Sequence, residues 1–316
     1  MILYLLKRLF YLIPVMFGVS IITFALINLA PGDPAEILLR SSGVEPTLEA
    51  VEAMREEFGL NNSVYMQYFH WLVKVLQLDL GNSFRTGQPV ALEVLSRFPA
   101  TLELTLAALF FMLLLAVPSG ICAALYKNAW IDHFSRLVAL FGASMPAFWL
   151  GLLLIYILAV KLHLFPVMGR GGWSHLVLPS ATLGFGLAAT YTRLLRSSML
   201  DVLGQDFIKV ARAKGLQEKL IISRHAMRNA LLPVVTVFGM SFGHLLGGTA
   251  IVETIFAWPG VGRLCVDSIF NRDYPVIQAY VLLMALVFVL VNLIVDISYV
   301  FLDPRIRLGK GDRYER

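Results

Sequence analysis

Residues 200–233, LDVLGQDFIKVARAKGLQEKLIISRHAMRNALLP, form the longest basic segment of the chain and lie between two uncharged runs of membrane-spanning length. A segment this basic between two spans is typical of the cytoplasmic side of a membrane. We predict a short surface helix, a break at Gly215 and a second helix that leads back into the bilayer. A soluble protein could bind this segment and move it. The bases are Lys209, Arg212, Lys214, Lys219, Arg224 and Arg228, against the acids Asp201, Asp206 and Glu218.

Two explanations of this segment stay open. Basic loops beside membrane helices commonly do no more than set the topology or contact anionic lipid. Docking of a protein is favoured by apolar side chains among the charges and by small residues that allow a close backbone approach. Nucleic acid is not indicated, because the segment has neither interleaved aromatic residues nor a known binding module. The apolar residues are Phe207, Val210, Leu216 and Leu220, and the small ones are Ala211, Ala213 and Gly215.

The composition predicts an all-α integral membrane protein. The chain has 316 residues, of which 58% are hydrophobic and 15% charged, and its mean hydropathy is +0.74. A soluble domain of this size could not bury so much apolar surface. Cys122 lies in an apolar run and Cys265 in a loop, so we expect no disulfide between them.

Apolar runs of about 20 residues predict about six transmembrane helices, with both termini in the cytoplasm. The first is too long for the apolar part of a signal peptide, and no small-residue cleavage site follows it. The expected spans are residues 9–30, 103–127, 136–161, 175–193, 228–253 and 273–303.

We expect three parts along the chain. Residues 1–98 hold the first transmembrane helix and an external cap region, which includes an amphipathic helix over residues 47–58. Residues 99–302 form the transmembrane core, with a cytoplasmic coupling segment at 200–229, and residues 303–316 form a basic cytoplasmic tail.

The sequence lacks motifs for ATP hydrolysis, metal binding or nucleophilic catalysis. It lacks a phosphate-binding P-loop, an HExxH or Cys-x-x-Cys metal motif and a GxSxG nucleophile motif. We therefore expect no catalytic residue, no metal site and no cofactor in this chain. Energy for uphill transport would have to come from another subunit.

Residues within the spans offer candidates for a translocation pathway. Polar or sulfur-containing side chains there are His244, Met240 and Met145. The alternative is packing or a hydrogen bond between helices, which is the commoner role of such residues. Gly239, Gly243 and Gly247 are spaced four apart, which favours a tight helix contact along one face.

Residues 211–233, ARAKGLQEKLIISRHAMRNALLP, resemble the cytoplasmic EAA-type loop of bacterial ABC-importer permeases in the dipeptide, oligopeptide and nickel branch. Lys209 and Val210 depart from the general form of that motif, which has Glu and Ala there. The resemblance covers essentially the whole chain. Its other motifs are PGDP at 31–34, RFPATLEL at 97–104, SMPAFWLG at 144–151, FAWPGVGR at 256–263, RDYPVIQ at 272–278 and LDPRIR at 302–307.

This resemblance implies a type I ABC importer permease fold in the bacterial cytoplasmic (inner) membrane. It also implies four kinds of partner: a second homologous permease, a pair of ATP-binding cassette ATPases that bind the ATP, an external solute-binding protein, and membrane lipid. The residues that it assigns to ATPase coupling are Ala211, Gly215, Arg224, His225, Arg228 and Asn229.

The cargo is less well determined by the sequence. MGRGGWSHLVLP at 168–179 and IFNRDYPVIQ at 269–278 are most similar to nickel permeases, so we expect nickel, as a chelate, and a dipeptide or oligopeptide as the alternative. A membrane scaffold that recruits cytoplasmic partners is an explanation of a different class. An intramembrane enzyme would need a polar cluster at bilayer depth, and only isolated candidates such as His244 are present.

Overall fold

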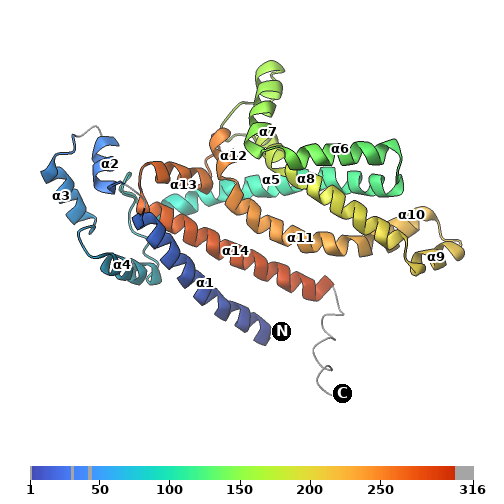
Figure 1. Ribbon diagram of the computed structural model, residues 1–316, viewed down its shortest axis with the longest axis horizontal. Helices are drawn as coiled ribbons and strands as arrows, with labels where there is room; N and C mark the ends of the chain where they lie inside the picture. Colours follow the sequence, from blue (N-terminus) through green and yellow to red (C-terminus); the bar gives the residue numbers. More distant parts are fainter. Residues whose placement is uncertain (1, 30–31, 42–44, 303–316) are drawn as a thin grey trace. The chain divides into compact units, whose positions relative to one another are not determined.

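The computed structural model describes residues 2–29, 32–41 and 45–302. In this part of the chain the regular structure is helical, with one isolated β-bridge between Asn82 and Pro89. The predicted tail at 303–316 lies outside the described residues. The elements are α1 (Ile2–Leu29), α2 (Pro34–Ser41), α3 (Leu48–Glu57), α4 (Val64–Leu76), α5 (Val90–Leu125), α6 (Trp130–Ser144), α7 (Ala147–Leu154), η1 (Ile155–Lys161), α8 (Trp173–Leu203), α9 (Asp206–Ala213), α10 (Glu218–Leu220), η2 (Ile221–Ala226), α11 (Met227–Gly248), α12 (Ala250–Ile255), α13 (Val261–Phe270) and α14 (Tyr274–Leu302), where η denotes a π-helix (Figure 1).

The expectation of six spans is corrected by the described residues, which contain four helices long and apolar enough to cross a bilayer, or five if α6 and α7 form one bent span. The stretches Phe10–Leu29, Val90–Leu125, Glu218–Gly247 and Tyr274–Val295 meet the criterion. The span expected at 175–193 does not, because α8 also carries Arg193, Arg196 and several hydroxyl residues. Polar side chains are tolerated on a helix that other helices enclose, and α8 packs against α6, α7, α11 and α12.

The span expected at 136–161 is broken. Its two halves, Trp130–Ser144 and Ala147–Lys161, are bent by 107°. The break follows from Pro146, which precedes the first residue of α7, because a proline disfavours the helical conformation of the residue before it. Met145 is accordingly extended, with φ −81° and ψ 128°.

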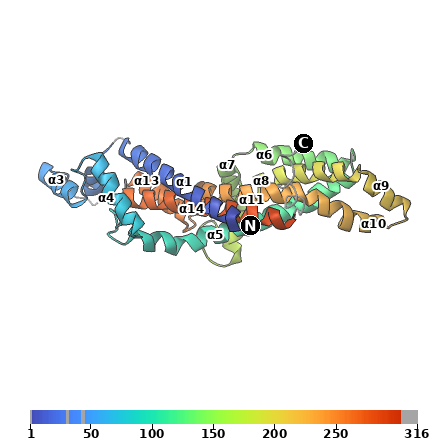
Figure 2. The same cartoon turned by 90° about the horizontal axis from the view of Figure 1, so that it is seen from below.

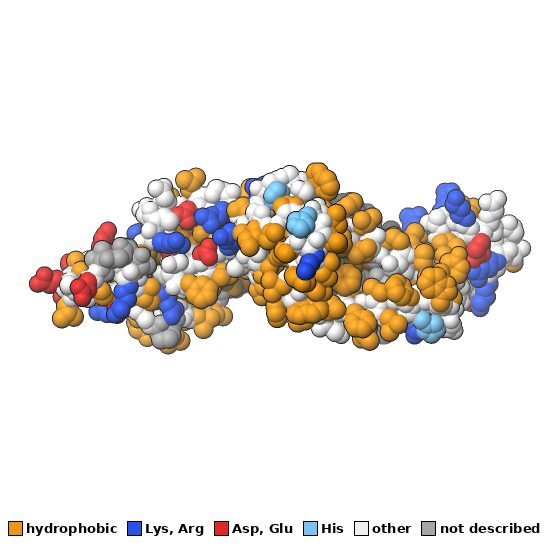
Figure 3. Space-filling view, turned by 90° about the horizontal axis from the view of Figure 1, so that it is seen from above, with side chains coloured by type: hydrophobic (Ala, Val, Ile, Leu, Met, Phe, Trp, Pro, Cys, Tyr) orange, Lys and Arg blue, Asp and Glu red, His pale blue; other side chains and the backbone are white. Residues whose placement is uncertain are grey.

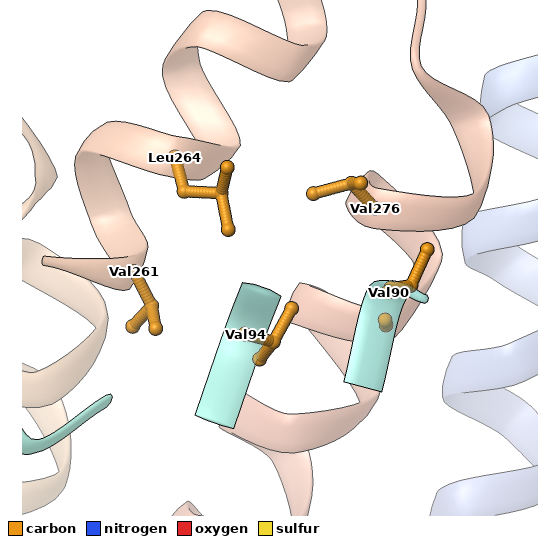
Figure 4. Close-up of a cluster of buried hydrophobic side chains, with 6 residues drawn as sticks. Val90, Val94, Val261, Leu264 and Val276 are labelled. Atoms are coloured by element: carbon orange, nitrogen blue, oxygen red, sulfur yellow. The ribbon is translucent and has the colours of Figure 1, made fainter. Parts of the chain in front are cut away.

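Two compact units can be distinguished, Met1–Leu102 with Ala257–Leu290 and Glu103–Phe256 with Val291–Arg316. In the first unit, Val90 and Val94 of α5 pack against α13 and the start of α14 (Figure 4). Trp258 is fully buried beside this core, and its Nε1 donates to the Ala100 carbonyl oxygen at 2.8 Å. The FAWPGVGR motif therefore fixes the entry to α13 against α5.

The first unit also contains the expected cap helix. α3 confirms the helix expected at residues 47–58, and Thr47 caps it by accepting a hydrogen bond from the Ala50 amide at 3.3 Å. None of its residues is buried. Asp273, at 3% exposure, accepts hydrogen bonds from the Ser83 hydroxyl and the Phe84 amide, which ties the end of the cap to the start of α14.

The second unit is built around α8, which lies beside α6 in both Figure 1 and Figure 2. Glycines allow the close approaches: a Cβ on Gly184 would lie 2.6 Å from the Ala108 carbonyl oxygen of α5. The glycine face predicted on α11 is confirmed at one position. A Cβ on Gly239 would lie 2.1 Å from Val295 of α14, whereas one on Gly247 would meet no atom within 4 Å.

Candidate coupling site

The coupling segment, residues 200–229, is a helix, a break and a second helix, as predicted. α8 ends at Leu203, α9 forms the short surface helix, and η2 leads into α11. α9 has two faces because residues three apart lie on the same side of a helix. Ile208 and Ala211 are buried on the inner face, which packs on η2.

The break is at Gly215, as predicted, and its cause is a left-handed backbone. Gly215 has φ +76°, a conformation that glycine adopts without steric cost. Its amide donates to the Arg212 carbonyl oxygen at 2.9 Å, and the Leu216 amide donates to Ala211 at 3.3 Å. These bonds end α9 and turn the chain toward α10. A Cβ on Gly215 would meet no atom within 4 Å, so this turn faces open space.

One ion pair fixes the two arms of this turn together. The Arg212 guanidinium donates to both Glu218 carboxylate oxygens, at 2.6 and 3.1 Å. The hydrogen bond to Glu218 raises the pKa of Arg212 above its ordinary value. Lys209 pairs with Asp206 at 2.8 Å. Both pairs are exposed, so they orient the turn more than they stabilise it.

The outer surface of the segment combines apolar and basic side chains. Phe207 and Val210, three residues apart on α9, are 45% and 52% exposed, and Leu216 and Leu220 are 37% and 39% exposed. Lys and Arg side chains gather at the α9–α10 end of the second unit (Figure 3). Exposed apolar side chains beside basic ones are typical of a surface that binds a protein, here one with an apolar groove and acidic edges.

The six residues predicted for coupling fall into two groups. Ala211 is 8% exposed and packs inward, whereas Gly215 is exposed at the turn. Arg224 and His225 lie in η2, and Arg228 and Asn229 follow one turn later, where the Asn229 amide donates to the His225 carbonyl oxygen at 2.8 Å. Arg224, Arg228 and Asn229 are exposed and His225 is half-buried. The second group therefore forms one patch along the helix that enters the bilayer.

The three pathway candidates lie at the break between α6 and α7 and in α11. Met145 is half-buried at the break between α6 and α7. Met240 and His244 lie in α11, one helical turn apart, and their side chains lie outside the described residues. Among the described residues, no group of three or more His, Cys, Asp or Glu side chains could hold a metal ion.

A buried ion pair near this segment was missed by the sequence analysis. Asp132, in the first turn of α6, is fully buried and accepts from Arg196 of α8 at 2.6 and 2.8 Å. The Asn128 amide donates to the same carboxylate at 2.9 Å. The only signal in the sequence was an acid at the start of an apolar helix, with a base just beyond the end expected for the fourth span.

Family models match nearly the whole chain. Residues 116–308 match the binding-protein-dependent transport system inner membrane component, and residues 1–105 match the N-terminal region of such membrane components. Glutathione transport system permease proteins GsiC of Escherichia coli and Shigella dysenteriae are 44% identical over 304 residues, 96% of this chain and 98% of theirs. The inward-facing MetNI methionine ABC transporter has a similar fold, with a TM-score of 0.58 and 18% identity over 66% of this chain and 96% of that one.

Proposed function

Because this chain belongs to the family of binding-protein-dependent transport system inner membrane components, we propose that it moves small peptides of the glutathione class through the membrane by alternating access. The chain is a multi-pass inner-membrane permease of an ABC importer in the peptide branch. It is not itself an enzyme; ATP is handled by partner ATPases, and an external binding protein is a further partner.

The observation that carries the mechanism is the construction of the coupling segment. Its inner face is packed and its outer face is exposed, so a partner that grips the outer face moves the whole segment. η2 continues into α11 without a break, so displacement of α9 reaches a membrane helix directly. The packed contact of α9 with η2 transmits this displacement. ATP-driven closure of the ATPases would then shift the bundle between two states.

The proposed docking surface has two parts. Phe207, Val210 and Leu216 fill an apolar groove of the ATPase, while Arg224, Arg228 and Asn229 bind its polar edge. Ala211 does not contact the ATPase in this arrangement, because it is buried where α9 packs on η2. Its role is to hold α9 in place. A second homologous permease, by resemblance, completes the pathway. Met145, Met240 and His244 remain candidates for its lining.

The cargo is proposed from the relatives. Permeases that are 44% identical over 96% of the chain are named for glutathione, a tripeptide, which favours the peptide alternative over nickel. The two motifs that suggested nickel have structural roles in this chain. Asp273 of the second motif holds the Ser83 loop, and the Gly169 amide of the first donates to the Phe256 carbonyl oxygen at 2.8 Å. Their similarity to nickel permeases is therefore weak support for a nickel cargo.

Coupling is tested by a charge at the turn. Gly215→Asp adds an unpaired carboxylate to a surface that the ATPase would bury, which costs about 1–3 kcal/mol or more. We expect ATP-driven uptake to fall about tenfold or more because the ATPase binds the segment more weakly, while insertion of the permease into the membrane persists. Gly215→Asn tolerates the same backbone without the charge and should retain most uptake.

The matched control for that variant is Gly87→Asp in the cap. Gly87 also has a left-handed backbone, with φ +70°, and a Cβ there also meets no atom within 4 Å. It lies far along the sequence from the coupling segment, so uptake should be unchanged. Equal losses in Gly87→Asp and Gly215→Asp would refute a specific coupling role of the turn.

Cargo is tested in liposomes that contain both permeases, the ATPases and the binding protein. Labelled glutathione and labelled nickel are compared as substrates, each against an excess of the other without label. We expect ATP-dependent accumulation of the peptide that excess nickel does not reduce. Accumulation of nickel alone would reverse the cargo assignment. ATPase activity that no solute stimulates would support the scaffold alternative.

A further inference from the structure

α4 is a short helix of the cap whose surface divides into three faces. Its 13 residues, Val64–Leu76, include no buried residue. One face packs on α1, and a second is polar and lines a cavity. The third is apolar and exposed, with Tyr65 at 87%, Phe69 at 60% and Leu76 at 76% exposure. Met66 and Val73, 52% and 37% exposed, lie next to Phe69 around the helix and extend this apolar face toward His70.

The contact with α1 places α4 at bilayer depth. The hydroxyl groups of Ser20 and Tyr68 lie 2.9 Å apart, and Tyr68 is the donor because Ser20 donates to the Phe17 carbonyl oxygen. Phe24 packs on Tyr68 edge-to-face with ring centroids 5.2 Å apart, and its centroid is 5.9 Å from that of Trp71. All of these contacts fall within the apolar span Phe10–Leu29.

The depth follows from helix geometry. Ser20 lies nine residues before Leu29, which is about 13 Å at the rise of an α-helix, and the hydrocarbon core is about 30 Å thick. α4 therefore packs against the outer half of the α1 span, given a cytoplasmic amino terminus. The surface of α1 here is itself apolar and exposed, for example Ile22 at 61% and Leu26 at 63%. This exposed apolar surface is suited to contact with lipid at the depth where α4 packs on the other side of α1.

The polar face of α4 is consistent with this placement. Gln67, His70 and Lys74 lie on the side opposite Phe69 and line a cavity of about 750 Å³ with Glu56, Glu57 and Asp79 of the cap. A polar cavity of this size holds water. α4 thus faces a cavity with polar side chains on one side and, on the other, carries aromatic and aliphatic side chains typical of helices that lie in a membrane interface.

We infer that α4 is a non-spanning helix embedded in the outer leaflet, with Tyr65, Met66, Phe69, Val73 and Leu76 in contact with lipid acyl chains. At 13 residues it is too short to cross the bilayer. It anchors the cap to the membrane surface and keeps the polar cavity open to the outside. This inference rests on the membrane location of the chain and does not depend on the cargo.

The test uses spin labels on the complete transporter in liposomes. Cys122→Ala and Cys265→Ala remove the native thiols, and single cysteines are placed at Phe69, Leu76 and Lys74. Power saturation measures accessibility to oxygen, which concentrates in lipid, and to a polar nickel chelate, which stays in water. Labels at Ile22 on α1 and Glu52 on α3 supply the lipid and water references.

We expect the labels at residues 69 and 76 to match the Ile22 label, with oxygen accessibility severalfold above that of the polar reagent. The label at residue 74 should match the Glu52 label. Polar-reagent accessibility at both 69 and 76 would overturn the inference, because the face would then lie in water. An immobile spectrum that neither reagent affects would also overturn it, because protein would then cover the face. The two positions report separately, so failure of one variant to fold leaves the other.

Discussion

Among single residues, burial separates the ion pair that holds helices together from those that orient a surface. Asp132 is fully buried between α6 and α8 and has three donors, two from Arg196 and one from the Asn128 amide. Arg212 and Glu218 form an equally short pair, but their side chains are 45% and 52% exposed. Water screens the second pair, whereas the first has no solvent to replace a lost partner.

Removal of one partner should therefore have unequal effects. We expect Arg196→Ala to destabilise the purified permease by about 3 kcal/mol, because the buried Asp132 carboxylate loses both short hydrogen bonds and keeps only the Asn128 amide and the more distant Arg136, at 3.6 Å. Glu36→Gln, which breaks the exposed pair with Arg40, should cost no more than about 0.5 kcal/mol. Thermal unfolding in detergent compares the two variants. Similar small shifts would mean that the Asp132 site is already hydrated.

Sequence patterns predicted the local structure of the coupling segment better than the contacts between distant residues. The helix, the break at Gly215 and the returning helix follow from charge, glycine and apolar spacing, all of which are local. The pairing of Asp132 with Arg196 joins residues 64 positions apart, and no local pattern specifies which of several bases an acid will meet. The same holds for the bond from Trp258 to Ala100, which depends on how α5 and α13 pack.

At the scale of elements, α8 differs most from the expectation. High hydropathy identifies helices that contact lipid. α8 is covered by its neighbours in the second unit, so its polar residues are tolerated and its hydropathy is lower. Its close contact with α5 depends on Gly184. The sequence directed attention to α11 instead, because the glycines there are spaced four apart. Gly239 of that series has a close neighbour in α14, whereas Gly247, at the same spacing, has no atom within 4 Å of its Cβ position, so spacing alone does not identify a contact.

Two glycines of α8 form a matched pair for testing this contact. Gly184→Ala would place a methyl group 2.6 Å from a backbone oxygen of α5, which cannot move aside alone, so we expect a loss of about 1–3 kcal/mol. Gly186→Ala meets its nearest atom at 3.6 Å and should be neutral or stabilising, since alanine favours a helix by up to about 1 kcal/mol. Thermal unfolding of both variants checks the difference. Equal stability of the two would mean that α5 and α8 lie further apart.

For the whole molecule, the central expectation is the orientation of the chain in the membrane. Four of the predicted spans correspond to helices that meet the length and hydropathy criterion. The sidedness came from charge alone: the coupling segment is basic and the cap is acidic. The charge rule could not supply the number of crossings, because it does not detect the break at Pro146 or the polar character of α8.

Sidedness is checked by labelling intact cells with a maleimide that does not cross membranes. In a background without native thiols, Glu52→Cys on α3 should react from outside, and Lys214→Cys on the coupling segment only after the cells are opened. Both positions are exposed in this chain, and reaction of Lys214→Cys after the cells are opened separates protection by the membrane from burial by a partner protein. Reaction of Lys214→Cys in intact cells would place the coupling segment outside the cell. It would then contradict the proposed coupling of this segment to cytoplasmic ATPases.

The bend at Pro146 has a consequence for solvent. The end of α6 and the start of α7 each leave backbone amide or carbonyl groups without a helical partner. The described contacts give α7 no side-chain cap there. Hydrocarbon does not tolerate such groups, so they must face a hydrated cavity or other protein. The backbone around Met145, which lies at this bend, must therefore be shielded from lipid acyl chains by water or by a neighbouring protein segment.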